Sequence, residues 1–144
     1  QQASAKEVFE NPSTAQVAQI TNDPGMNIFA GSVTDNKIVL NSDIQFDLPT
    51  HFNDLKQGAY SFGLRAAAIS LHEDGFPFSI ELAEISGSET FLHLKHGDIQ
   101  VVGLLDAVQN FNIGEVVNVR FDIEYLYAFA VDGRLKSSPY GGLK

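Results

Sequence analysis

The sequence contains no cysteine and no tryptophan, and its single methionine is Met26. Without cysteine the chain can form no disulfide, use no thiolate nucleophile and offer no cysteine ligand to zinc. Long apolar runs are also missing. The longest, Tyr125–Val131, is far below the ~20 residues that a membrane-spanning helix requires, so we expect no direct membrane insertion. The first residues lack the pattern of a secretory signal and no initiator methionine precedes them, so we expect a piece of a longer protein.

Positive charge is scarce in this chain. Nine lysine and arginine residues stand against 18 aspartate and glutamate residues, which gives a formal net charge of −9. Such a chain repels phosphate backbones. We therefore expect no nucleic-acid partner, and a single-stranded nucleic-acid module is disfavoured for the same reason.

Two catalytic loops are absent from the sequence. Phosphoryl transfer from ATP uses a G-x-x-x-x-G-K-[ST] loop to hold the phosphates and help bind magnesium, and no such loop occurs. A G-x-S-x-G elbow, which would present a serine nucleophile, is missing too. We predict that this chain is not an enzyme and has no catalytic residue, metal or cofactor of its own.

Apolar side chains are plentiful by contrast. Hydrophobic residues make up 44% of the 144 residues, and eleven of them are phenylalanine. A chain of this length fits one domain and buries roughly 70% of the surface that its unfolded form would expose. The composition therefore allows a substantial core without disulfides.

The stretch Phe78–Leu105 has the clearest pattern. Apolar residues alternate with polar ones from Phe78 to Leu82 and again from Thr90 to Lys95, which is typical of half-buried strands. Gly87 lies between these runs and can adopt the positive φ of a tight reversal. Gly97-Asp98 turns the chain again before a third apolar run. The stretch predicts a meander in the wall of a barrel or sandwich.

Short strands are predicted along most of the remaining chain, separated by turn residues such as Asp35-Asn36 and Asp132-Gly133. Pro49–Gly58 is predicted to be a loop with at most one helical turn, and the tail Ser137–Gly142 is predicted to be loosely held. The predicted strands are Asn27–Thr34, Lys37–Leu40, Ile44–Leu48, Tyr60–Arg65, Ile69–Leu71, Glu115–Asp122 and Tyr125–Val131.

Helices are predicted only near the start of the chain. Ser4 and Glu7 have capping-box spacing and predict a short helix to about Phe9, and Ser13–Ile20 predicts a second one. We therefore divide the chain into a helical tail with a linker, residues 1–24, and an all-β domain, residues 25–144.

Several short motifs occur in the same order as in a known family of transporter subunits. The motifs are Gln2–Pro12 (Q-x-S-x-x-E-V-F-x-x-P), Val17-Ala18, Pro24-x-Met26-Asn27, Gly63-Leu64-Arg65, Gly87-Ser88-Glu89-Thr90 with His93, and Phe121–Phe129 (F-D-x-E-x-L-Y-x-F) followed by Asp132-Gly133-Arg134-Leu135. Together they resemble the ATP-binding subunits of sugar-type ABC importers, from the end of the nucleotide-binding domain through the C-terminal regulatory (TOBE-type) domain. The sequence departs from that pattern at Ala66-Ala67, where the family has Pro-Glu, and at Ile123, where it has Pro.

The resemblance implies an OB-like barrel elaborated with extra strands, and contact between two copies of the domain. It implies permease subunits as partners of the intact parent, docking of a regulatory protein, and a cytoplasmic location at the inner face of the cell membrane. ATP and magnesium are implied only for the missing nucleotide-binding domain. The predicted function is accordingly a non-catalytic regulatory and dimerisation domain of an importer for sugars or polyol phosphates. A barrel that senses a small sugar or oxyanion is the alternative.

Seven residues are candidates for interface or regulatory contacts. Arg65 directly follows an apolar strand, so we expect a partly buried guanidinium with a carboxylate or carbonyl partner. Exposed aromatic side chains are expected around Phe91 and His93 and along the strand from Tyr125 through Tyr127 to Phe129, and these form the predicted contact surface. Glu89, in the G-x-E-T motif, completes the set.

Three other patterns have plainer explanations. Ile85–Glu89 resembles the L-S-G-G-Q signature of ABC proteins, but its place between two predicted strands favours a hairpin turn. His93 and His96 should lie on opposite faces of a strand, which disfavours a shared metal. Asp122 and Glu124 could share a strand face, yet carboxylates on an acidic surface are normally just solvated.

Overall fold

The computed structural model describes residues 25–139 with the exception of Ser42. Within that range the protein is built from ten strands and three 3-10 turns, and the strands form two antiparallel sheets. The predicted all-β, barrel-like fold is confirmed. The two helices predicted before residue 21 lie outside the described residues, and the predicted boundary between residues 24 and 25 stays a prediction.

The described chain forms two compact units. The second unit is Arg65–Asp122, and the first is made of the described residues before and after it. None of the helices in the described part of the chain has the length and apolar character needed to cross a membrane.

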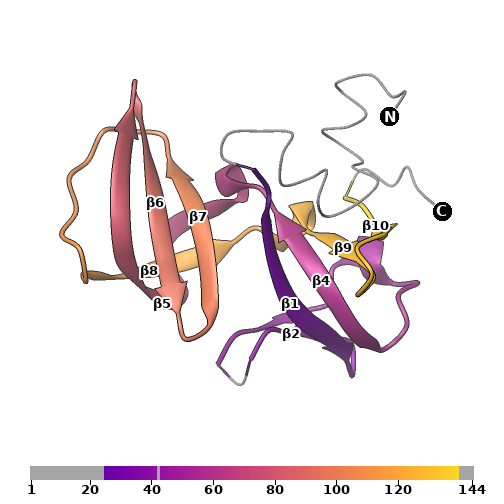
Figure 1. The fold of residues 1–144 in the computed structure, drawn as a ribbon. Coiled ribbons are helices and arrows are strands. Elements are labelled where there is room, and N and C mark those ends of the chain that lie inside the picture. The colour runs from indigo at the N-terminus through magenta and orange to yellow at the C-terminus, as the bar shows by residue number, and fades with distance from the viewer. Residues whose placement is uncertain (1–24, 42, 140–144) are drawn as a thin grey trace, which may run out of the picture. The chain divides into compact units, whose positions relative to one another are not determined.

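The first unit contains a six-stranded sheet with the order β10-β9-β4-β1-β2-β3 (Figure 1). Its strands are β1 (Asn27–Thr34), β2 (Lys37–Val39), β3 (Gln45–Asp47), β4 (Gly58–Leu64), β9 (Tyr127–Phe129) and β10 (Leu135–Ser137), and its 3-10 turns are η1 (Thr50–Phe52) and η3 (Ile123–Tyr125). Asp35 and Asn36 have φ values of 52° and 62°, and Thr34 pairs with Lys37 around them. Asp and Asn tolerate this left-handed conformation, so the predicted two-residue turn forms here.

Both faces of this sheet are apolar around β4 and β9. One face carries Phe29 and Phe62 in one row, and the ring of Phe52 stacks on Phe62 with centroids 6.1 Å apart. The other face buries a cluster of Met26, Tyr127 and Phe129, against which Ile28 and Leu135 pack. Gly63 lies beneath this cluster, where an added Cβ would lie 3.0 Å from the ring of Phe129, so a larger residue would push the cluster away.

The burial of β9 corrects one prediction. Tyr127 and Phe129 were expected on an exposed contact surface, yet they are 2% and 0% exposed. The reason is that β9 lies inside a sheet whose two faces are both covered by apolar side chains, so no residue of this strand reaches solvent.

The end of the described chain is also better ordered than predicted. β10 pairs with β9, and Ser137 and Ser138 are buried. The Ser137 hydroxyl donates a hydrogen bond of 2.9 Å to the carbonyl of His51. The ring Nε2 of His51 is 2.7 Å from the carbonyl oxygen of Leu126. These bonds hold η1 against Leu126 and against β10, and they join residues far apart in sequence.

The second unit contains a four-stranded sheet with the order β7-β6-β5-β8, and β5, β6 and β7 lie side by side in Figure 1. Its elements are η2 (Ala66–Ala68), β5 (Ile69–Ser86), β6 (Glu89–His96), β7 (Ile99–Leu105) and β8 (Val116–Phe121). The predicted meander is confirmed, and Gly87 and Gly97 have φ values of 62° and 58° in its two turns.

β5 is longer than the two separate runs that the sequence predicted. Leu71 and Phe76 both pair with Val119, so the residues between them form a bulge that the continuous strand accommodates. At Gly75 an added Cβ would collide with the backbone of Val119, so only glycine fits this close approach. The first residues of β5 also approach β7, where a Cβ at Gly103 would lie 3.0 Å from the carbonyl oxygen of Ile69.

Candidate functional site

An irregularity in β5 decides which side chains reach the surface of the second unit. Ile80 pairs with Leu94, whereas Leu82 pairs with His93, so β5 has one extra residue between the two pairs. Ile80 is 1% exposed and Leu82 is 44% exposed. The alternation of the sequence had placed both on the buried face, and the bulge is the reason why that prediction is wrong for Leu82.

The bulge creates a surface that we call the outer face, made of side chains from β5, β6 and β7. Pairing arranges it in three rows across the strands. The rows are Glu84–Phe91–Leu104, Leu82–His93–Val102 and Ser79–Lys95–Gln100. The first row therefore carries the acidic group, the last carries the basic group, and the apolar side chains lie in the first and central rows.

A hydrogen bond joins two neighbouring rows of the outer face. His93 Nε2–H donates to Glu84 Oε1 at 2.5 Å, and the side chains are 36% and 58% exposed. Pairs this exposed contribute little to folding. The bond does orient the carboxylate of Glu84 over the sheet.

The opposite, inner face holds the core of this unit. Phe78 packs its ring against Phe121 at 5.8 Å between centroids, and His96 lies 5.4 Å from the same ring. Nδ1 of His96 lies 2.6 Å from the carbonyl oxygen of Pro77. His93 and His96 therefore lie on opposite faces of β6, as predicted. They also bond to different partners, His93 to Glu84 and His96 to the Pro77 carbonyl.

Thr90 is the most deeply buried polar residue of the hairpin, with 0% exposure. Its hydroxyl donates a hydrogen bond of 2.7 Å to the carbonyl of Ala107 and accepts one of 3.3 Å from the backbone N–H of Gln109. Thr90 thus anchors the long connection between β7 and β8. The threonine of the G-x-E-T motif has a structural role in this chain, and Glu89 before it is only half-buried at the start of β6.

The two remaining candidates are Arg65 and Tyr125. Arg65 is half-buried and directly precedes η2, where its carbonyl accepts a 2.9 Å hydrogen bond from the N–H of Ala68. Tyr125 lies in η3 and is 48% exposed. Because residues 123–125 form a 3-10 turn, Asp122 and Glu124 do not share a strand face, contrary to prediction.

Sequence reasoning found Phe91 and His93 but missed Leu82 and the role of Glu84. Counting back from the two-residue turn at Gly87 would have placed Glu84 opposite Phe91, diagonal to His93. The signal was therefore present for Glu84. The same counting places Leu82 opposite His93, whereas the alternation that begins at Phe78 had placed Leu82 on the buried face with Ile80.

One electrostatic effect is clear on the surface of the first unit. The pKa of the Asp132 carboxyl is lowered from its ordinary value of 3.8, chiefly because the backbone N–H of Arg134 donates a hydrogen bond to it. The guanidinium of Arg134 adds a second contact of 2.8 Å to the same carboxylate. Both contacts close the turn at Gly133, so this pair holds a loop and shows no sign of catalytic tuning.

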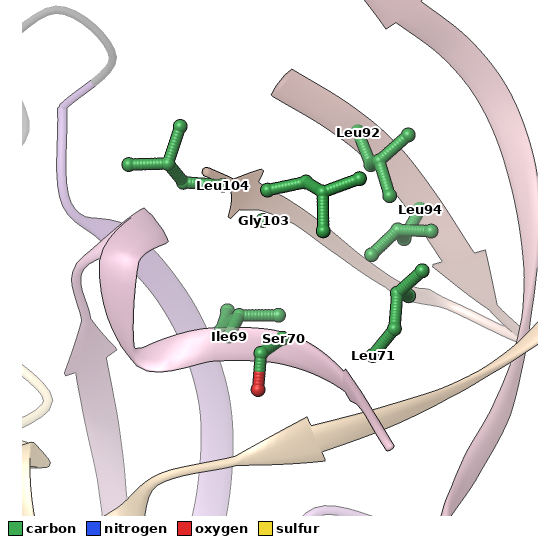
Figure 2. Close-up of a pocket in the computed structure, with 8 residues that line it drawn as sticks. Ile69, Ser70, Leu71, Leu92, Leu94, Gly103 and Leu104 are labelled. Atoms are coloured by element: carbon green, nitrogen blue, oxygen red, sulfur yellow. The ribbon is translucent and has the colours of Figure 1, made fainter. Parts of the chain in front are cut away.

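A small cavity opens on the inner side of the second unit (Figure 2). Its volume is about 10 Å³, and Ile69, Leu71, Leu92 and Leu94 are among its lining residues. The Ser70 hydroxyl points away from the leucine side chains in Figure 2. A space this small holds at most one water and offers no polar partners. This cavity therefore does not favour the small-ligand alternative.

Comparison with known proteins finds similarity to ATP-binding subunits of transporters. No family model matches it. It is 27% identical over 136 residues to the sn-glycerol-3-phosphate import ATP-binding protein UgpC of Psychromonas ingrahamii, covering 88% of this chain and 36% of that protein. It is 28% identical to UgpC of Vibrio vulnificus, covering 85% of this chain and 34% of that protein. It is 24% identical to the uncharacterised ABC transporter ATP-binding protein YcjV of Escherichia coli O6:H1, covering 86% of this chain and 37% of that protein.

These similarities confirm the resemblance that the short motifs predicted. The matched part lies in the C-terminal region of the relatives. The chain spans about a third of the length of the curated relatives that it matches.

Proposed function

We propose that this chain is a non-catalytic regulatory and dimerisation domain of the ATP-binding subunit of an ABC importer for sugars or related polyol phosphates. The observation that carries the proposal is its similarity to the C-terminal region of proteins named as sn-glycerol-3-phosphate import ATP-binding proteins. Nearly the whole of this chain is matched, but only about a third of those proteins.

The chemistry of the sequence agrees with a role outside catalysis. Nucleotide binding in this class of ATPase needs a glycine-rich loop that ends in Lys-Ser or Lys-Thr, and the 144 residues contain none. ATP and magnesium then belong to another domain of the parent subunit. We further propose that the parent works with permease subunits at the cytoplasmic face of the membrane, and that a regulatory protein docks on this domain.

Two measurements on the purified chain test the proposal. Equilibrium dialysis with ATP and magnesium should detect no appreciable binding, and phosphate release should not follow the protein peak in gel filtration. Sedimentation equilibrium should detect weak self-association. ATP turnover that follows the protein through purification would contradict the non-catalytic role, and a strict monomer at all concentrations would contradict the dimerisation role.

A variant of the turn that resembles the ABC signature serves as a control for the first measurement. Ser86→Ala and Ser88→Ala remove both hydroxyls from an exposed hairpin turn and leave Gly87 in place. Any contaminating ATPase activity should be identical in the two preparations. A drop in turnover in this variant would show that the turn contacts nucleotide after all.

A further inference from the structure

We propose that two copies of this chain associate through the outer face in an antiparallel two-fold arrangement, with Glu84 of each copy opposite Lys95 of the other. The inference rests on the proposed dimerisation function and identifies the surface that performs it. Its basis is the row structure that the β5 bulge creates, and no residue of the buried β9 takes part.

The first and central rows of the outer face supply an apolar contact. Leu82 is 44% exposed and lies diagonally beside Phe91, which is half-buried. Leu104 pairs with Phe91 on the far strand, and in Figure 2 its side chain points away from Leu92 and Leu94 of the inner face. Neighbouring apolar side chains of this kind on a sheet surface favour association because contact removes them from water.

The charged groups of the outer face lie at its two ends. Glu84 belongs to the first row and Lys95 to the third, on either side of the row that contains His93. The two outer rows are separated by four residues of β6, roughly 13 Å of extended strand. Among the described residues Lys95 makes no ion pair, whereas Glu84 is hydrogen-bonded to His93. The ammonium group of Lys95 therefore remains available for a partner.

A two-fold axis explains how this surface matches itself. A two-fold axis that runs parallel to the sheet, above the outer face and perpendicular to the strands over the His93 row, places the first row of one copy over the third row of the other. Each Glu84 then lies over Ser79 of the other copy, and Lys95 on the neighbouring strand reaches it with its long side chain. Both Glu84–Lys95 contacts then form at once, as required for an isologous interface. Two chains with a net charge of −9 each repel at long range, and opposite charges that meet in the contact offset this repulsion locally.

The size of the outer face sets the strength of this contact. Three strands at a spacing of about 4.8 Å and five residues at about 3.3 Å give a face roughly 15 Å on a side. That is well below the ~800 Å² per partner of a stable interface, so the isolated chain should form a weak dimer.

Two charge-reversal variants, studied alone and mixed, test the arrangement. Glu84→Lys places lysine opposite lysine twice in its own dimer, and Lys95→Glu places glutamate opposite glutamate twice. We expect each variant to self-associate about tenfold more weakly than the wild type, because like charges would face each other. An equimolar mixture should recover association as a heterodimer, since both contacts are then between opposite charges.

Sedimentation equilibrium at low salt, with one variant carrying a fluorophore, measures all three affinities. Asp54→Lys and Lys136→Glu are matched controls, because they make the same changes in net charge on exposed residues of the first unit. Circular dichroism should show unchanged folding for all four variants.

The outcomes separate the surface from the function. A wild type that dimerises while both outer-face variants dimerise equally well, or a mixture no tighter than its components, would overturn the outer face as the interface and leave the dimerisation function standing. A wild type that stays monomeric would overturn the dimerisation function itself. Preferential pairing of the control variants would show that net charge alone governs association, and would overturn the proposed contacts.

Discussion

His93 and Glu84 are nine residues apart in sequence and are hydrogen-bonded across two strands at 2.5 Å, although the ladder pairs His93 with Leu82 and Glu84 with Phe91. The contact is diagonal, between neighbouring rows of the outer face. It exists because the turn at Gly87 sets the register of the hairpin. The same register puts Leu82 and Phe91 beside each other, so one local turn determines both the polar and the apolar parts of the surface.

Gly87→Val should destabilise the protein by about 1–3 kcal/mol, because a β-branched residue is strained at a φ of 62°. An added Cβ would meet no atom within 4 Å, so the effect would come from the backbone and not from a clash. Urea denaturation monitored by circular dichroism measures the change. Ser86→Val, at the exposed end of β5, is the matched control and should stay within about 0.5 kcal/mol of the wild type. An unchanged midpoint for the glycine variant would refute this account of the hairpin.

Thr90→Val should lower the free energy of unfolding by about 1–3 kcal/mol, because the Ala107 carbonyl and the Gln109 N–H both lose their hydroxyl partner. Hydrogen exchange at the Gln109 amide should accelerate in the variant. Thr90→Ser keeps the hydroxyl and should retain most of the protection at that amide. Equal protection in the valine variant and the wild type would show that the loop between β7 and β8 is held by other contacts.

The carboxyl of Asp132 should titrate below 3.8 in the folded protein, as NMR of the side-chain carbon can measure. Because its pKa is lowered on folding, the carboxylate stabilises the fold above the ordinary pKa, and this contribution is lost as the pH falls through the folded pKa. Arg134→Met removes the guanidinium but keeps the backbone N–H, so the pKa should rise only part of the way. A full return to the ordinary value would show that the guanidinium, and not the backbone hydrogen bond, is the main cause.

Self-association should strengthen, or at least not weaken, as salt rises from 0.02 to 0.3 M. Two copies with a net charge of −9 repel over long distances, and the Debye length falls to near 10 Å at about 0.1 M salt. The Glu84–Lys95 contacts are short, so salt should screen them less than it screens the overall repulsion. Sedimentation equilibrium across the salt series measures this balance. If the dimer dissociates as salt is added, the Glu84–Lys95 contacts, and not the net charge, determine how self-association depends on salt.

The parts of the fold that depend on neighbouring residues were predictable. The strands near Asn27–Thr34 and Glu115–Asp122, and the turns at Asp35-Asn36 and Gly97, follow from side-chain alternation and from residues that tolerate positive φ. The short motifs likewise indicated the resemblance to ABC importer ATP-binding subunits, because their order along the chain is a property of the sequence alone.

The tertiary structure decided which particular side chains are exposed. Ile80 is held in the core by backbone hydrogen bonds of 2.8 Å to the Glu115 carbonyl and 2.7 Å from the Gly114 N–H, more than thirty residues away. The extra residue that follows turns Leu82 outward. Tyr127 and Phe129 of β9 are buried because Met26 and Leu135, from opposite ends of the described chain, pack with them. Alternation along one strand can say that two faces differ, but only the contacts between distant strands decide which face meets water.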